Sequence, residues 1–172
     1  MKRFLVMLAA FAATASAQET ITTEGVIEAP VAQVWNAWAT SRGLRAWLSP
    51  HADIDLRVGG LMRSNYNEKG TLGDAGTIEN KVLSFEPQRM LSIQVARAPA
   101  DFPFRARVGE MWTVLYFTPA PGNKTLLRIV ALGFKPDADA QVMRDFFNRG
   151  NAATLTQLQE YFSRCRRANT CG

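Results

Sequence analysis

One long amphipathic helix at the end of the chain is the feature that most constrains the fold. Apolar residues recur at steps of three and four over residues 137–163: Val142, Met143, Phe146, Phe147, Leu155, Leu158, Tyr161 and Phe162. This spacing predicts a helix with one apolar stripe along its length. Such a stripe has to be buried against another element, and the preceding residues indicate what that element is.

The chain before this helix has a period of two, with apolar and polar residues alternating in short segments. The alternation predicts a first strand at 20–28 and further strands near 52–58, 61–66, 77–85, 91–95, 110–117 and 125–134. Two short helices, at 31–38 and 44–48, follow the first strand. Strands joined by short turns pair antiparallel. The sequence therefore predicts an α+β fold, in which a curved antiparallel sheet of six to seven strands wraps on the long C-terminal helix.

The double glycine in DLRVGGLMR, residues 55–63, has two contrasting interpretations. A glycine-rich turn that opens a helix can bind phosphate through its amides. Here the glycines stand between two alternating segments, and no helix follows them. Paired glycines between strands are typical of a β-hairpin, which is what we predict at this position.

The N-terminus has the three parts of a signal peptide. Lys2 and Arg3 form a basic start, residues 4–13 are an apolar run too short to span a bilayer, and 15–17 read Ala-Ser-Ala. We expect cleavage after Ala17, which leaves a single domain at 18–172 in the periplasm or the medium, with no integral membrane segment. The alternative is a buried N-terminal helix or a membrane anchor.

Two cysteines, Cys165 and Cys171, lie near the C-terminus. In an oxidising compartment such a pair usually forms a disulfide, which would tie the end of the chain to its helix. A redox-active pair is the alternative, although the Cys-x-x-Cys spacing is absent.

The charge pattern argues against nucleic-acid binding. Loss of Lys2 and Arg3 with the leader leaves 18 basic and 15 acidic residues, a small excess that includes Arg164, Arg166 and Arg167. A solvated basic tail explains this cluster, and the sequence has no recognition motif. With one histidine, His51, the chain offers no histidine-based metal cluster, so we expect no metal and no cofactor.

Four short motifs, taken in order, resemble the activator-of-Hsp90-ATPase-homologue-like branch of the START-like (SRPBCC) superfamily, whose members have the helix-grip fold. They are Val34-Trp35-x-Ala37, Trp47, Ile54-Asp55-Leu56-Arg57-x-Gly59-Gly60 and Glu86-Pro87-x-Arg89. The resemblance implies a deep apolar cavity between helix and sheet, in which members bind lipids, hormones, polyketides or other hydrophobic molecules. The co-chaperone role in the branch name requires a cytosolic partner, so we do not transfer it to a chain with an export signal.

If the cavity exists, aromatic residues and their neighbours are the candidates to line it: Met62, Tyr66, Trp112, Tyr116, Phe146 and Gly150. The 98–107 loop, with Phe102 and Phe104, is either a lid or an ordinary loop whose rings fill the core.

We expect the chain to bind a small hydrophobic molecule in this cavity without transforming it. The alternatives are an enzyme of the cyclase, isomerase or hydrolase type that acts on an apolar substrate in the same cavity, and a protein-interaction module. The enzyme would need a buried acid or phenol, for which Glu110, Tyr66 and Tyr116 are the weak catalytic candidates. The alternative for Glu110 is an outward-facing strand residue. Ligand identity and oligomeric state stay open.

Overall fold

The computed structural model describes residues 20–168, and its elements confirm the predicted α+β order. Residues 1–17, where we predict the signal peptide, and Cys171 lie outside this range. The elements are β1 Ile21–Ile27, α1 Val31–Ala39, α2 Ser41–Trp47, β2 His51–Ile54, β3 Leu61–Asn65, β4 Ile78–Glu86, β5 Met90–Arg97, the 3-10 turn η1 Val108–Glu110, β6 Trp112–Ala120, β7 Lys124–Leu132 and α3 Ala138–Ala168.

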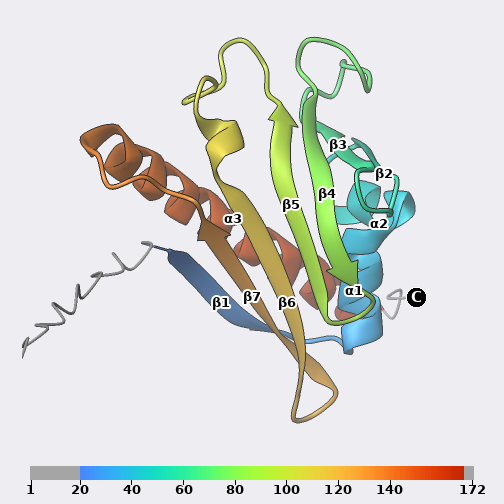
Figure 1. The fold of residues 1–172 in the computed structure, drawn as a ribbon. Coiled ribbons are helices and arrows are strands. Elements are labelled where there is room, and N and C mark those ends of the chain that lie inside the picture. The colour runs from blue at the N-terminus through green and yellow to red at the C-terminus, as the bar shows by residue number, and fades with distance from the viewer. Residues whose placement is uncertain (1–19, 169–172) are drawn as a thin grey trace, which may run out of the picture.

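The seven strands form one antiparallel sheet in the order β1-β7-β6-β5-β4-β3-β2. Each strand pairs with the next along the chain from β2 to β7, and β1 closes onto β7. Figure 1 shows α3 crossing one face of the curved sheet, with α1 and α2 beside its C-terminal half. This is the helix-grip arrangement predicted from the sequence.

Local sequence explains where the helices begin. Pro30 precedes α1 with φ at −65°, a value that its ring imposes and that suits a helix start. The Thr40 hydroxyl accepts a hydrogen bond from the Gly43 amide, 3.0 Å away, at the start of α2. Asp137 accepts from the Ala140 amide at 2.8 Å and so satisfies one of the free donors of α3.

Two separate apolar clusters hold α3 against the sheet. The larger cluster joins α1, α2 and the sheet to Leu155, Leu158 and Phe162. The smaller cluster surrounds Met143 near the start of α3, with Ile21, Met111, Ala131 and Phe134. The two ends of the helix are therefore anchored independently.

The predicted hairpin at the double glycine is confirmed, because β2 pairs antiparallel with β3. The strand predicted over 52–58 is too long, since β2 ends at Ile54 and Val58 is 66% exposed. The chain turns over residues 55–60. A Cβ at Gly60 would lie 2.1 Å from the Asp55 carbonyl oxygen, so this tight turn requires glycine.

The two edge strands bond to side chains from the helices. On β2, the Ala52 carbonyl accepts from Arg45 at 2.9 Å, and the Ile54 amide donates to the Ser41 hydroxyl at 3.0 Å. On β1, the Val26 carbonyl accepts from Gln159 of α3 at 3.1 Å. Helices thus supply partners for backbone groups at both edges of the sheet.

Cys165 is buried on α3. Its disulfide with Cys171 stays a prediction, because Cys171 is not among the described residues. Of the helices within residues 20–168, none has both the length and the hydropathy needed to cross a bilayer.

Candidate ligand pocket

A pocket of about 310 Å³ lies between the inner face of the sheet and the middle of α3. Small-molecule sites are typically clefts of roughly 300–1,000 Å³ with mostly apolar walls. The residues that line this pocket are Trp38, Leu48, Met62, Ser64, Tyr66, Ile78, Asn80, Ile93, Val95, Phe102, Met111, Thr113, Leu115, Ile129, Phe146, Phe147, Gly150, Asn151 and Thr154.

The pocket exists because α3 has small or polar residues where its inward stripe would otherwise continue. Met143 and Leu155 are buried, but no residue of the described segment 144–154 is. Gly150, Asn151 and Thr154 line the pocket in this interval. The helix is therefore held at both ends, while its middle leaves space above the sheet.

Inward-facing side chains of the sheet form the wall of the pocket opposite α3. Successive side chains of a strand point to opposite faces, and the inward positions of β3, β4 and β6 include Ser64, Asn80 and Thr113. Together with Asn151 and Thr154 they add polar groups to a largely apolar lining. None of these five residues is among those predicted from the sequence to line a cavity.

Four of the six predicted cavity residues lie in the pocket: Met62, Tyr66, Phe146 and Gly150. The prediction for Trp112 and Tyr116 is wrong. Both occupy alternate positions of β6 from Thr113 and Leu115, which line the pocket, and so they face the other side of the sheet. Tyr116 is 36% exposed, and the Arg128 guanidinium lies 4.9 Å from its ring centre.

Tyr66 lies at the mouth of the pocket, where 56% of its surface is exposed. Partial burial raises the pKa of its phenol above the usual value, and a hydrogen bond with Ser64 opposes the shift. The hydroxyl is therefore protonated at neutral pH. It can donate a hydrogen bond there, but it is a poor general base.

Glu110 is not a cavity acid, and the strand predicted from residue 110 starts later. The residue belongs to η1, outside the pocket, and its carboxylate lies 2.8 Å from Lys135 and 3.6 Å from Arg107. The hydrogen bond from Lys135 is the main reason that the pKa of Glu110 is lowered. An ionised surface carboxylate of this kind is unsuited to general acid catalysis at neutral pH.

The 98–107 loop contributes one aromatic ring to the pocket lining. Phe102 lines the pocket, and its ring meets that of Phe146 edge-on at 5.9 Å. Phe104 is not part of the lining, but its ring also packs on Phe146, at 5.7 Å. These contacts fit both earlier interpretations, so a lid movement stays a prediction.

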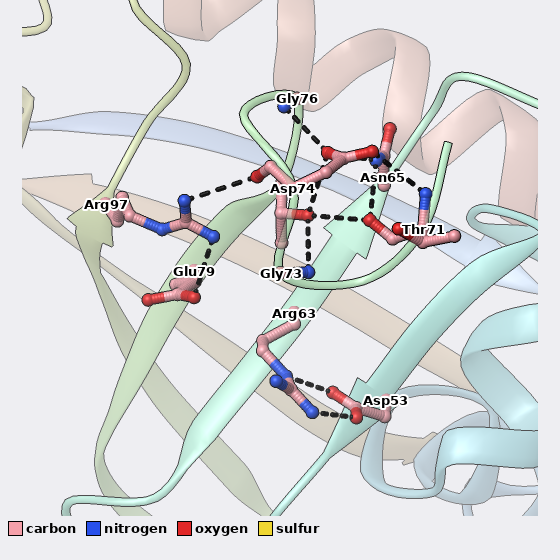
Figure 2. A network of polar contacts seen from close by, with 10 residues as sticks. Asp53, Arg63, Asn65, Thr71, Gly73, Asp74, Gly76, Glu79 and Arg97 are labelled. Carbon is pink, nitrogen blue, oxygen red and sulfur yellow. Dashed lines mark hydrogen bonds and ion pairs between the residues drawn. The ribbon is translucent and has the colours of Figure 1, made fainter. Parts of the chain in front are cut away.

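A hydrogen-bond network fixes the loop that follows Tyr66 (Figure 2). Asp74 accepts from the amides of Thr71 and Gly76, at 2.9 and 2.8 Å, and from the Asn65 side chain at 2.8 Å. Arg97 of β5 donates to the Asp74 carbonyl and to Glu79 of β4. The loop at the mouth of the pocket is therefore tied to two strands.

We expect stability to fall on acidification in part through Asp74. Backbone hydrogen bonds from Thr71 and then Gly76 lower the pKa of this carboxyl in the folded chain. A depressed folded-state pKa stabilises the fold above the unfolded-state value of about 4, and this contribution is lost as the pH falls below it. Urea unfolding should show that Asp74→Asn is less stable than wild type at pH 7 and that the difference shrinks towards about pH 3.

Asp101→Asn, a change in the exposed 98–107 loop, is the matched control and should follow the wild-type pH curve. An Asp74→Asn variant that keeps the full wild-type difference at low pH would contradict this assignment.

A second hollow, of about 260 Å³, lies where α1 and α2 meet the C-terminal part of α3. Gln33, Asn36, Thr40 and Arg42 give it a polar rim. The space under the middle of α3 is the more apolar of the two, which makes it the better candidate for a small-molecule site. In the described part of the chain there is no group of three or more side chains suited to binding a metal ion.

An antiparallel sheet that grips one long helix over an apolar pocket defines the class of START-like, helix-grip domains. Comparison with known proteins supports the same class. Residues 28–163 match the family model described as activator of Hsp90 ATPase homolog 1-like protein. The chain therefore belongs to this family, within the SRPBCC superfamily, and the resemblance noted in the sequence is confirmed.

Solved structures show the same fold. Protein MLL2253 from Mesorhizobium loti has a TM-score of 0.66 and 24% identity, with 85% of this chain and 98% of that one covered. The Aha1 dimer from Colwellia psychrerythraea has a TM-score of 0.64 and 17% identity over 84% and 96%. CalU16 from Micromonospora echinospora has a TM-score of 0.59 and 21% identity over 88% and 80%. No curated protein matches the sequence.

Proposed function

We propose that the chain is an exported protein that binds a small hydrophobic molecule in the pocket beneath α3. The observation that carries this proposal is the interval between the two apolar clusters, where residues 144–154 leave a space lined mostly by apolar side chains. Burial of apolar ligand surface there would supply roughly 25 cal/mol per Å² before the costs of association.

Export rests on the leader pattern of residues 1–17, with its basic start, short apolar run and Ala-Ser-Ala end. An exported chain would be located in the periplasm or the medium, where the disulfide between Cys165 and Cys171 would form. We do not extend the co-chaperone activity in the family description to this chain, because its fold alone does not define its function.

The enzyme alternative has less support. Of its three catalytic candidates, Glu110 and Tyr116 lie outside the pocket, and Tyr66 stands at the mouth with a protonated phenol. Within residues 20–168 no apolar patch favours the protein-interaction alternative, because the exposed large apolar residues are dispersed over separate elements: Val26, Val58, Tyr66, Tyr116 and Val142.

One experiment tests both parts of the proposal. The chain is expressed with its own leader in a Gram-negative host, recovered from the periplasm or the medium, and examined by native mass spectrometry. We expect the mass of a chain that begins at Gln18, and this mass should be two units below that of the reduced form because of the disulfide. Additional peaks should show a bound apolar molecule, and denaturing conditions should remove them. Retention of residues 1–17 in the cytosol contradicts export. A ligand-free spectrum, together with no displacement of a fluorescent apolar probe, contradicts ligand binding.

A further inference from the structure

The Trp38 indole has no hydrogen-bond partner for its nitrogen. Trp38 is 4% exposed, lines the pocket from α1, and its Nε1 is a buried donor without an acceptor among residues 20–168. Its neighbour Trp47, whose ring centre lies 4.8 Å away, donates its own Nε1–H to the Ala37 carbonyl at 2.9 Å. Of these two packed indoles, Trp47 has a hydrogen-bond acceptor and lies outside the pocket, whereas Trp38 has none and lines the pocket.

A second donor in the same wall is also without a partner. The Asn151 side chain lines the pocket from α3, and its Nδ2 is buried with no acceptor within the described part of the chain. Buried polar groups are nearly always paired, and a buried donor without an acceptor destabilises the folded chain. Two orphaned donors from different helices, both in the lining of one pocket, indicate that the site is built to receive a hydrogen-bond acceptor.

The lining also limits the charge of that acceptor. Its nineteen residues include no lysine, arginine or histidine, and no aspartate or glutamate. A carboxylate or phosphate buried there would lack a counter-ion, and an unpaired buried charge is far more costly than a neutral polar group. A carbonyl oxygen is neutral and accepts two hydrogen bonds without donating one.

We propose that the ligand is an uncharged apolar molecule with a carbonyl oxygen, of the ketone, ester or amide class, which accepts hydrogen bonds from Trp38 Nε1 and Asn151 Nδ2. This inference rests on the proposed binding function. Both nitrogens are buried in this structure, so binding requires a movement of the two side chains that brings the nitrogens to the acceptor. The apolar remainder of the ligand lies along Ile93, Met111 and Leu115 on the sheet side of the pocket.

The indole signals of the ¹⁵N-labelled protein test this directly. The chain has four tryptophans, and hence four indole N–H correlations, of which Trp38→Phe and Trp47→Phe identify two. The probes are methyl octyl ketone, decane and decanoate, which share ten carbons. We expect the ketone to move the Trp38 indole proton downfield, while the signal of the already bonded Trp47 stays close to its position.

Binding by competition with a fluorescent apolar probe gives the second readout. Each hydrogen bond corresponds to about a fivefold preference for the ketone over decane, so the two together give roughly 25-fold. Trp38→Phe keeps the apolar ring but loses one of the two donors, so the preference should fall to about fivefold. Trp47→Phe is the matched control, because it removes an indole whose donor is already used, and it should keep the preference.

The outcomes separate the two proposals. Binding of ketone and decane with equal affinity, and an unmoved Trp38 signal in the wild-type protein, overturns the carbonyl assignment and leaves hydrophobic binding in place. Decanoate bound at least as tightly as the ketone overturns the neutral-ligand assignment. Failure of all three probes to bind overturns the proposed function itself.

Discussion

Replacement of Thr113 by tryptophan is expected to weaken binding of an apolar ligand at least tenfold, which is about 1.4 kcal/mol. Thr113 lies on the inward face of β6, paired with Ile93 and Ala131, and its side chain lines the pocket. An indole at this position fills much of a space of about 310 Å³. Because the added ring enters existing space, the stability of the variant should change by less than the roughly 1–3 kcal/mol typical of overpacked cores. Titration with a fluorescent apolar probe measures the affinity.

Thr118→Trp is the control for this variant, since it places the same ring on the same strand at an exposed position outside the pocket. It should bind the probe like wild type. Unchanged affinity in Thr113→Trp, with a folded protein by circular dichroism, would show that the probe binds elsewhere.

We expect Leu158→Ala to produce the largest loss of stability among these variants. Leu158 is fully buried in the larger apolar cluster, where α3 is anchored to the sheet. Truncation of a buried leucine costs about 2–5 kcal/mol, because apolar contacts are lost and a cavity remains. The free energy of unfolding from urea denaturation should fall by about 3 kcal/mol.

Val142→Ala on the same helix is the matched control, because Val142 is 57% exposed. Its effect should stay within about 0.5 kcal/mol, as for most surface substitutions. A similar loss in both variants would contradict the assigned role of Leu158 packing, because alanine has a higher helix propensity than either residue and only Leu158 is buried.

The order of strands and helices could be predicted because each element has a clear period. The step of three and four over 137–163 corresponds to α3, and the alternating segments correspond to β2–β7. Boundaries were less accurate where a turn continues the alternation, as it does at Leu56 and Val58. At this position the chain leaves the strand in a tight turn, in which Gly60 packs closely against the Asp55 carbonyl oxygen.

The face of a strand is harder to predict when both of its faces are apolar. On β6, Trp112 and Val114 alternate with Thr113 and Leu115, and Met111 just before the strand is also apolar, so hydrophobicity does not indicate which set points to α3. The choice of large aromatics selected the wrong set. Only the pairing of β6 with β5 and β7, and the position of α3, determine that Thr113 and Leu115 face the pocket.

The residues of α3 that line the pocket could have been predicted from the sequence. Asn151 and Thr154 fall between Phe147 and Leu158 at the spacing of the inward stripe, where apolar residues would otherwise continue. Gly150 was noticed, but its polar neighbours were not. The lone donor of Trp38, in contrast, has no sequence signature, because it depends on which carbonyls lie nearby in the folded chain.

The hydrogen bonds between helix side chains and the edge strands β1 and β2 affect how this protein can associate with other chains. An open edge strand is a template for strand addition, which leads either to recognition of extended peptides or to aggregation. Arg45 and Ser41 on β2, and Gln159 on β1, compete with any incoming strand for the backbone groups that they bind. These bonds oppose edge-to-edge polymerisation at the backbone groups that they occupy.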